Sequence, residues 1–381
     1  MKQILVTSHK LNFFMKKILL ILLAGAVPAF GQPLRSPEVQ PDGRVTFRLR
    51  APNAHEVQLH SEGVSGTAMT KDSQGVWSFT SEPLEPDIYS YSFAVDGLRL
   101  IDPSNPRMKY NLLNNDSQLH VPGPGSLAWE LNDVPHGQVH HHFYKSAVAG
   151  DDRDFYVYTP PGYDPAARKK YPALYLLHGY SDDASAWTSV GQANVILDNL
   201  IARQQARPMV VVMPLGYGTM DIVRAGWQRV RDPGLWQRNV EVFQQALLQE
   251  VIPQAEKSYR LTPKREARAI AGLSMGGSES LLTGLNHLDR FAWVGAFSSG
   301  GLGTNFPASF PKLDAAANAQ LRLLWVGCGR QDGLFAGNEQ FSEWLTARGV
   351  RHEWVATPGQ HSFRVWRGYL AEFAPRLFPE K

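Results

Sequence analysis

The sequence is poor in cysteine: Cys328 is the only one among 381 residues. An intramolecular disulfide is therefore excluded, and the fold must be stabilised by burial of apolar side chains. Cys328 ends the apolar run LRLLWVGC, which favours a small buried residue over a reactive thiol. The chain also lacks internal repeats and low-complexity segments. Its 43% hydrophobic and 19% charged residues are typical of a globular protein and exclude a disordered one.

The chain also lacks a strong excess of one charge, since it contains 38 Lys and Arg and 35 Asp and Glu residues. The basic excess comes from residues 1–31, which hold four lysines and no acidic residue. The rest of the chain has 34 basic and 35 acidic residues and a net charge of −1. This balance offers no basic surface for a polyanion, so we expect no nucleic-acid partner.

Long apolar runs are absent after residue 31, and we expect no transmembrane helix there. Residues 15–30 read MKKILLILLAGAVPAF, a short positive segment followed by an apolar run, and Ala29 and Gly31 place small residues before a cleavage site. The run is shorter than the ~20 residues that span a bilayer. We therefore interpret 1–31 as a signal peptide, with 1–14 as an upstream extension. The mature protein is expected to be secreted or periplasmic, with no membrane partner.

Residues 32–122 show the pattern of a small β domain. Apolar and polar residues alternate in four segments separated by clusters of Pro, Gly, Asn and Asp; the segments are 45–50, 56–61, 75–81 and 88–95. This spacing favours an immunoglobulin-like sandwich. A Pro- and Gly-rich stretch follows, and we place a linker at 123–136.

Residues 137–381 alternate predicted strands with predicted helices. The strands are expected at 155–160, 173–179, 209–214, 268–274, 291–298, 321–327 and 352–357. Several are continuous apolar runs, as in strands covered on both faces, and 236–259 has the periodicity of an amphipathic helix. The pattern predicts an α/β fold with a mostly parallel central sheet, preceded by a small all-β domain.

The most specific motif is GLSMGG at 272–277, which follows a predicted strand and precedes a helical pattern. A nucleophile elbow needs this strand–turn–helix context, and glycines flank the serine because the turn is too tight for side chains. The helix that follows directs its positive end toward the serine. Ser274 is therefore the predicted nucleophile.

A serine nucleophile needs a histidine base, which follows it in the chain order of this architecture. Three histidines lie after Ser274. His287 ends the predicted helix and His352 begins a predicted strand, so both fit structural roles. His361 lies in a loop just beyond the last predicted strand, where an imidazole can reach the serine, and we predict it as the base.

The acid that orients the histidine is expected between the two. Asp332 lies in a loop just after the penultimate predicted strand, which is the expected place. Asp289 and Asp314 satisfy the chain order but not this placement, and Glu339 and Glu343 belong to the next predicted helix. We predict Asp332 as the third member of the triad.

Two backbone N–H groups must stabilise the oxyanion of the tetrahedral intermediate. Met275, the residue after the nucleophile, supplies one, and Tyr180, in the loop after the strand ALYLL, supplies the other. His178 precedes the serine in sequence and is interpreted as shaping this loop.

Two further groups of residues could contribute to a site. The run His136, His140, His141 and His142 has no cysteine beside it, which favours a solvated strand edge over a metal site. We expect neither a metal nor a cofactor. Aromatic residues can form a wall for a planar phenolic group near the nucleophile. The candidates are Trp187, Trp227 and Trp236.

From about residue 137 to the C-terminus the chain resembles the esterase D family of α/β-hydrolases, and within it carbohydrate esterase family 1. The segments that carry this resemblance are YTPPGYDPAARKKYPALYLLHGYSDDASAW, ILDNLIARQQARPMVVVMP, GLSMGG, CGRQD and PGQHSFRVWRGYL. Members of this family include feruloyl and acetylxylan esterases. The resemblance implies the α/β-hydrolase fold, the same triad and oxyanion donors, and the plant polysaccharide arabinoxylan as substrate.

The N-terminal domain is similar to family 48 carbohydrate-binding modules, especially across YSYSFAVDGLRLIDPSN. Its candidate sugar-stacking residues are Trp77, Tyr89 and Tyr91. Because all triad and oxyanion residues lie in 137–381, we expect that region to be chemically complete without 32–122.

These observations predict a secreted serine esterase that removes feruloyl groups from arabinoxylan. The alternatives are an acetylxylan esterase, an enterochelin-type siderophore esterase and a non-catalytic carbohydrate-binding protein. The net charge of −1 disfavours a trianionic catecholate substrate, and the complete triad disfavours a non-catalytic role.

Overall fold

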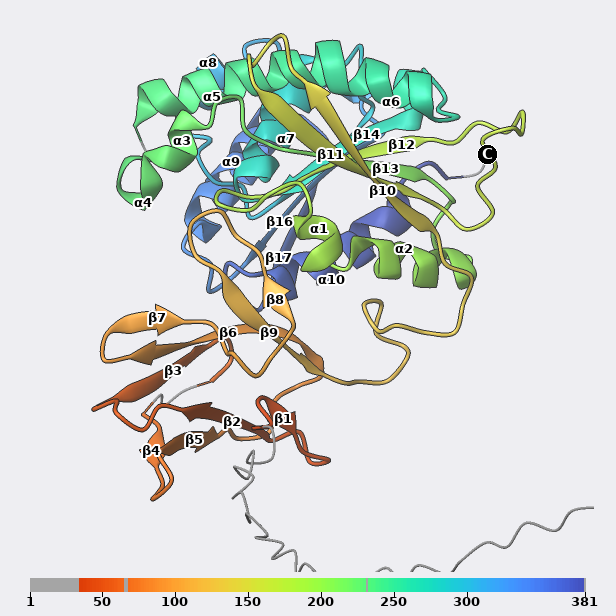
Figure 1. Cartoon of the computed structure of the whole chain (residues 1–381). Coiled ribbons are helices and arrows are strands. Elements are labelled where there is room, and N and C mark those ends of the chain that lie inside the picture. Colours follow the sequence, from red (N-terminus) through yellow and green to blue (C-terminus); the bar gives the residue numbers. More distant parts are fainter. Residues whose placement is uncertain (1–33, 65–67, 231, 380–381) are drawn as a thin grey trace, which may run out of the picture. The chain divides into compact units, whose positions relative to one another are not determined.

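The computed structural model describes residues 34–64, 68–230 and 232–379 (Figure 1). The predicted signal peptide, 1–31, lies outside the described residues. Among the described helices, none is long and apolar enough to cross a membrane.

The N-terminal domain consists of two antiparallel sheets. The first has the order β1 (Glu38–Val39), β2 (Val45–Arg50), β5 (Val76–Thr80), β4 (Thr70–Lys71). The second has the order β3 (Val57–Ser61), β6 (Asp87–Val95), β9 (Asp116–Val121), β8 (Met108–Lys109), with β7 (Leu98–Leu100) paired to β6. Residues from both sheets share one apolar core, including Phe47 of the first sheet and Leu59 and Phe93 of the second. The all-β domain and its alternating strands are thus as predicted.

Trp77, Tyr89 and Tyr91 belong to this core, with exposed fractions of 8%, 2% and 0%. Their polar atoms are also used internally: the Trp77 indole N–H donates to the Ala51 carbonyl, and the Tyr91 hydroxyl donates to Asp102. A buried ring has no free face for a sugar to stack on. The prediction that these three side chains bind carbohydrate is therefore wrong.

The C-terminal domain is built on an eight-stranded sheet with the order β10-β11-β13-β12-β14-β15-β16-β17. The strands are β10 (Gln138–Lys145), β11 (Asp152–Thr159), β12 (Ala173–Leu177), β13 (Val210–Pro214), β14 (Arg268–Leu273), β15 (Trp293–Phe297), β16 (Leu323–Gly329) and β17 (Glu353–Thr357). β10 and β11 pair antiparallel, as do β11 and β13, and all other neighbours are parallel. The mostly parallel sheet is therefore confirmed.

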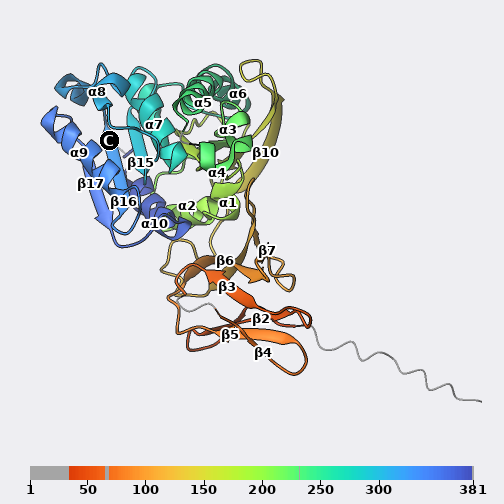
Figure 2. The same cartoon turned by 90° about the vertical axis from the view of Figure 1, so that its left-hand side faces the viewer.

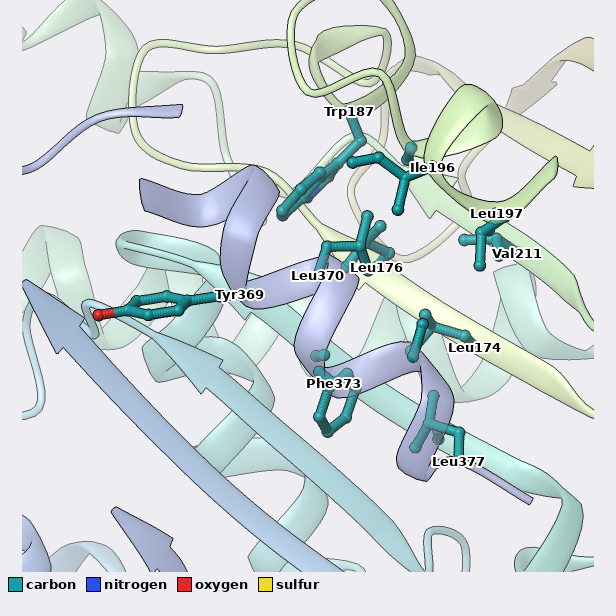
Figure 3. Close-up of a cluster of buried hydrophobic side chains, with 14 of the residues drawn as sticks. Leu174, Leu176, Trp187, Ile196, Leu197, Val211, Tyr369, Leu370, Phe373 and Leu377 are labelled. Carbon is teal, nitrogen blue, oxygen red and sulfur yellow. The ribbon is translucent and has the colours of Figure 1, made fainter. Parts of the chain in front are cut away.

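Helices cover both faces of this sheet (Figures 1 and 2). They are α1 (Ala186–Ser189), α2 (Ala193–Ala202), α3 (Asp221–Arg224), α4 (Gly226–Arg229), α5 (Pro233–Ala246), α6 (Ile252–Ser258), α7 (Met275–Asn286), α8 (Phe306–Ser309), α9 (Phe335–Ala347) and α10 (Phe363–Phe373). The sequence of β12 is continuously apolar because both faces of this strand are covered. Leu174 and Leu176 pack against α2 and α10 (Figure 3), while Tyr175 and Leu177 belong to the core on the other face.

The predicted helix at 236–259 is a continuous helical run of α5, a π-helical segment (Leu247–Val251) and α6. Its predicted apolar face, from Val240 through Phe243 to Ala255, is buried. Pro253 cannot donate a backbone hydrogen bond to the preceding turn, and the hydrogen-bond pattern widens just before it.

His140, His141 and His142 lie on β10, the edge strand of the sheet, whereas His136 precedes this strand and pairs with Asp198 of α2. His140 and His142 share the partly buried face, and His142 stacks on Phe155 and pairs with the Tyr259 hydroxyl. His141 points the other way and pairs with Asp154. In the described part of the chain, no three His, Cys, Asp or Glu side chains gather closely enough to hold a metal ion.

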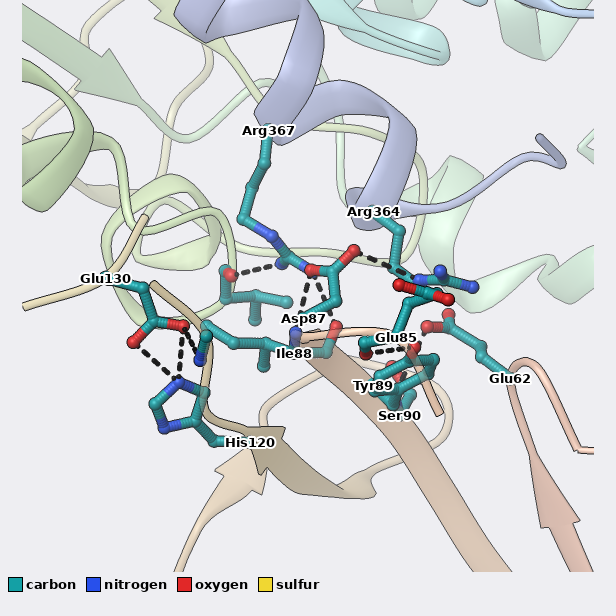
Figure 4. A network of polar contacts seen from close by, with 12 residues as sticks. Glu62, Glu85, Asp87, Ile88, Tyr89, Ser90, His120, Glu130, Arg364 and Arg367 are labelled. Atoms are coloured by element: carbon teal, nitrogen blue, oxygen red, sulfur yellow. Dashed lines mark hydrogen bonds and ion pairs between the residues drawn. The ribbon is translucent and has the colours of Figure 1, made fainter. Parts of the chain in front are cut away.

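Arg367 of α10 links the C-terminal domain to the N-terminal domain (Figure 4). Its buried guanidinium donates to the Asp87 carboxylate, at 2.7 Å, and to the Ile88 carbonyl of β6, and to the Val190 carbonyl of the C-terminal domain. Arg364, one turn earlier, also pairs with Asp87. Helix α10 therefore holds strand β6 by a buried ion pair.

The segment predicted as a linker, 123–136, is hydrogen-bonded to helix α2. The Asn199 side chain donates to the carbonyls of Ala128 and Glu130. Residues 35–381 form one compact unit, so the segment connects the two domains while packing against one of them.

Candidate active site

Ser274 occupies a sharp turn between β14 and α7. Its backbone has φ +52° and ψ −116°, an uncommon conformation for a residue with a side chain. The glycines on either side are required by close contacts: a Cβ at Gly272 would lie 2.5 Å from the Gly276 carbonyl oxygen, and one at Gly276 would lie 2.4 Å from the His178 carbonyl oxygen. The geometry is that of the nucleophile elbow predicted from GLSMGG.

The three residues predicted as a triad lie together. His361 Nε2 is 2.9 Å from Ser274 Oγ, and His361 Nδ1 is 2.7 Å from Asp332 Oδ2. Asp332 follows β16, and His361 lies in the loop between β17 and α10. The competing Asp314 caps a short helical turn by accepting from the Ala316 N–H, a structural role.

The surroundings of Asp332 keep it charged. Burial opposes ionisation, but the hydrogen bond from His361 and the one from the Leu334 N–H outweigh it and hold the pKa of Asp332 below its ordinary value. An ionised Asp332 accepts the Nδ1–H of His361, which leaves the Nε2 lone pair facing the Ser274 hydroxyl. Ser274 can then lose its proton to His361 as it attacks.

The two predicted oxyanion donors flank this serine. Met275 is the first residue of α7, so its N–H has no partner within the helix. Tyr180 lies in the loop after β12, and in the described residues its N–H makes no hydrogen bond. His178 shapes this loop as predicted: its buried ring donates from Nδ1 to the Gly179 carbonyl and accepts from the Gly216 N–H at Nε2, both at 2.8 Å.

A pocket of about 270 Å³ opens beside the triad. It is lined by residues from four parts of the chain: Lys109, Asn111, Asn114 and Asp116; Gly179, Tyr180, Ser181 and Asp182; Trp227; and Leu273, Ser274, His361, Ser362, Phe363 and Trp366. The first group belongs to strands β8 and β9 and the loop between them, in the N-terminal domain. Sequence reasoning missed these residues because no local pattern shows that a loop of one domain reaches the nucleophile of the other.

The three predicted substrate-binding tryptophans lie in different environments. Trp227 lines the pocket, is 58% exposed and packs edge-to-face on the Tyr180 ring. Trp236 is partly buried in the apolar cluster around Tyr180 and Met275. Trp187 is 1% exposed, donates its indole N–H to the Leu177 carbonyl and lies in the core shown in Figure 3. The prediction that Trp187 contacts substrate is therefore wrong, because its ring is fully covered.

Two buried carboxyl groups near the site were not predicted. Glu279, on the first turns of α7, is fully buried, and this burial raises its pKa well above the ordinary value despite a hydrogen bond from Asn239. Asp182 is also buried, which raises its pKa. Burial therefore disfavours the charged form of both groups, whereas the hydrogen bonds of Asp332 favour its charged form.

Comparison with known proteins identifies the relatives of this chain. The model of the family described as "Putative esterase" matches residues 146–377. An endo-1,4-beta-xylanase/feruloyl esterase of Xylanibacter ruminicola is 31% identical over 350 residues, covering 90% of this chain and 46% of the relative. The chain spans about half the length of the curated relatives that it matches.

Solved structures share the fold. A ferulic acid esterase is 26% identical with a TM-score of 0.54, covering 63% of this chain and 97% of that one. The enterobactin esterase of Shigella flexneri is 20% identical with a TM-score of 0.65, covering 87% of this chain and 92% of that one. At 20% identity, the similarity to the enterobactin esterase is evidence for the fold alone. The aligned part of this chain is longer than the region matched by the family model.

Proposed function

This chain belongs to the esterase family, and we propose that it is a feruloyl esterase that releases hydroxycinnamoyl groups from arabinoxylan. It is a serine carboxylic ester hydrolase of the carbohydrate esterase family 1 type, with the α/β-hydrolase fold. The observation that carries the proposal is the hydrogen-bonded series Ser274–His361–Asp332 at a pocket lined by the exposed Trp227.

The geometry supports a two-step mechanism. Ser274 Oγ attacks the ester carbonyl carbon while His361 Nε2 takes its proton, and the N–H groups of Met275 and Tyr180 stabilise the oxyanion. The intermediate collapses to an acyl-serine as His361 returns the proton to the leaving sugar oxygen. Water then attacks the acyl-serine and gives its proton to His361, which passes it to Ser274 Oγ as the acyl–oxygen bond breaks and the acid is released. Asp332 stabilises the imidazolium that forms in both steps.

The aromatic acyl group is supported by the pocket and by the relatives. The exposed ring of Trp227 offers an apolar face to a planar phenolic group, and the buried Trp366 also lines the pocket. The name of the Xylanibacter ruminicola relative includes feruloyl esterase, and the similar structure at 26% identity is a ferulic acid esterase. A trianionic catecholate is less well supported, because Lys109, the single cationic side chain that lines the described pocket, lies there with Asp116 and Asp182.

The finer assignments of the N-terminal region belong to the same proposal. Its two sheets around one core suit an immunoglobulin-like domain related to family 48 carbohydrate-binding modules. Residues 1–31 would direct export, giving a secreted or periplasmic enzyme with arabinoxylan as its partner. Sequencing the N-terminus of the protein recovered from outside the cytoplasm tests export, and an intact Met1 there would contradict cleavage.

The substrate is tested by assaying methyl ferulate, acetylated xylan and a catecholate triester side by side with the wild type and Ser274→Ala. We expect methyl ferulate to have the highest kcat/KM, and Ser274→Ala to lower turnover by ~10³-fold or more. Faster turnover of acetylated xylan or the triester would refute the feruloyl assignment. Undiminished turnover in Ser274→Ala would refute the serine mechanism.

A further inference from the structure

The loop between β8 and β9 of the N-terminal domain is hydrogen-bonded to the loop that carries Tyr180. The Leu112 N–H donates to the Ser181 carbonyl at 2.7 Å. The Asn111 side-chain amide donates to Ser181 Oγ at 2.9 Å and to Asp182 Oδ1 at 3.1 Å. Three hydrogen bonds therefore join the N-terminal domain to the two residues that follow the proposed oxyanion donor.

Ser181 needs such support because of its backbone conformation. Its φ is +70°, in the left-handed region that residues other than glycine seldom adopt. Such a conformation persists only where the surroundings hold it. Because Ser181 directly follows Tyr180, relaxation of Ser181 would change the direction of the chain at Tyr180 and turn its N–H away from the oxyanion.

Asn111 is itself held in place. Its side-chain oxygen accepts from the N–H groups of Leu113 and Asn114, and its own N–H donates to the Asn115 side chain. On the other side, Asp182 is 5% exposed, and Asn111 donates a hydrogen bond to its carboxyl group. Loss of this donor would leave a buried carboxyl group unpaired, which is costly and favours rearrangement of the loop.

We propose that Asn111 is a positioning residue for the oxyanion hole, holding Ser181 and Asp182 so that the Tyr180 N–H faces the reacting carbonyl. The proposal rests on the proposed function, because it takes Tyr180 as an oxyanion donor. It makes the N-terminal domain part of the catalytic unit. The sequence-based expectation was that residues 137–381 are chemically complete. On this proposal, residues 137–381 alone lack a group that positions the oxyanion hole.

The first test is Asn111→Asp in the full chain, assayed with 4-nitrophenyl acetate. The substitution keeps the shape of the side chain and its acceptor for Leu113 and Asn114, but it removes the donor to Asp182 and to Ser181 Oγ. Of these two, the serine hydroxyl can itself donate to the new carboxylate. We expect kcat to fall about 10- to 100-fold, less than the loss of an entire oxyanion donor, with KM within about threefold. The matched control is Asn115→Asp, which adds the same charge to the same loop and keeps its acceptor for the Asn111 N–H. Its kcat should stay within about twofold.

The second test is rescue. In the double variant Asn111→Asp/Asp182→Asn the hydrogen bond is restored in the opposite direction, with the amide at position 182 as the donor. We expect kcat to recover to within about fivefold of wild type, a coupling that double-mutant cycles detect. Unchanged kcat in Asn111→Asp, an equal loss in Asn115→Asp, or no recovery in the double variant would overturn the proposal.

Folding is followed by thermal unfolding of every variant. If Asn111→Asp does not fold, Asn111→Ala carries the same prediction without adding a charge, and failure of both to fold would make Asn111 a folding determinant and contradict a positioning role. The aryl acetate separates this inference from the substrate assignment. A wild type that hydrolyses 4-nitrophenyl acetate but not methyl ferulate refutes the feruloyl proposal and leaves the Asn111 test intact.

Discussion

Asp332 and Glu279 are both buried carboxyl groups of the C-terminal domain, and their surroundings shift their pKa values in opposite directions. Asp332 is hydrogen-bonded to His361 and to the Leu334 N–H, which lowers its pKa against the effect of burial. Glu279 has a single side-chain donor, Asn239, and burial raises its pKa. The surroundings therefore favour the charged form of Asp332 and disfavour that of Glu279, a difference that the sequence alone does not show.

Asp332→Asn tests the role of the charge. The neutral amide carries no negative charge, so the His361 imidazolium loses its electrostatic support. Its NH2 group can donate to Nδ1, which favours the wrong tautomer of His361. We expect kcat to fall by about 10³- to 10⁴-fold with little change in the unfolding midpoint. Asp314→Asn is the control and should leave kcat near wild type. The opposite pattern would identify Asp314 as the acid.

Glu279→Gln tests the raised pKa of Glu279 through the pH dependence of stability. The raised pKa means that the folded state keeps a proton that the unfolded state releases above its ordinary pKa of 4.5. The stability of the wild type must therefore fall as pH rises from 4.5 toward the folded-state pKa, by at most about 1.4 kcal/mol per pH unit from this group.

Glutamine does not titrate, so Glu279→Gln should lack this loss. The free energy of unfolding in urea, measured for both proteins at pH 5 and pH 8, should favour the variant more strongly at pH 8. The contribution of Asp182 is common to both proteins and cancels in the difference. If the free energies of unfolding of the two proteins differ by the same amount at pH 5 and pH 8, Glu279 ionises normally in the folded state.

The strand–turn–helix element around Ser274 depends on backbone contacts that a motif only implies. The His178 carbonyl oxygen and the backbone of Leu177 approach Gly276 closely, so that the start of α7 lies directly against the end of β12. This contact brings Met275 and the Tyr180 loop to the same end of the sheet. The glycine is therefore required by the packing of two elements as well as by the turn.

Gly276→Ala should separate these elements. The new Cβ would lie 2.4 Å from the His178 carbonyl oxygen, which cannot move without displacing the oxyanion loop. We expect kcat to fall by about 10²-fold or more and the unfolding midpoint to drop. Gly337→Ala in α9 is the control: no atom lies within 4 Å of its Cβ position, so the substitution should stabilise the helix by about 0.5–1 kcal/mol. Equal behaviour of the two variants would contradict this view of the elbow.

At the scale of the whole molecule, Arg367 and Asp87 form a buried ion pair between α10 and β6, and Arg364 pairs with the same carboxylate. Removal of Arg367 leaves Asp87 with Arg364 alone and deprives the carbonyls of Ile88 and Val190 of their donor, so it is costlier than breaking an exposed pair. The pair therefore helps to fix the N-terminal domain, and with it the loop between β8 and β9 that lines the pocket.

Arg367→Met is expected to lower the free energy of unfolding in urea by about 3–5 kcal/mol. Arg376→Met, which breaks the half-exposed pairs with Glu353 and Glu372, should cost less than about 1 kcal/mol. Similar losses in the two variants would show that the Arg367 pair is no more important than a surface pair.

Much of the fold and of the site follows from local pattern. Continuous apolar runs mark strands covered on both faces, and GLSMGG after such a run marks the elbow, because both depend on neighbours in the chain. Asp332 and His361 were found because loops after parallel strands meet at one end of the sheet. Tyr89 and Tyr91 were predicted to be exposed and are buried. The sequence does contain the signal for burial, because the two residues lie four and two positions before the buried Phe93 and therefore on the same face of β6.

Other features depend on contacts between residues far apart in the chain, which neither periodicity nor motif encodes. The covering of Trp187 by α10, the raised pKa of Glu279 and the hydrogen bonds of Asn111 to residues 70 and 71 positions later are of this kind. Burial and hydrogen-bond partners set both pKa values and side-chain exposure, and they exist only once the domains have packed. The chemistry of the nucleophile can therefore be inferred from a few consecutive residues, whereas the walls of its pocket arise from the folded chain as a whole.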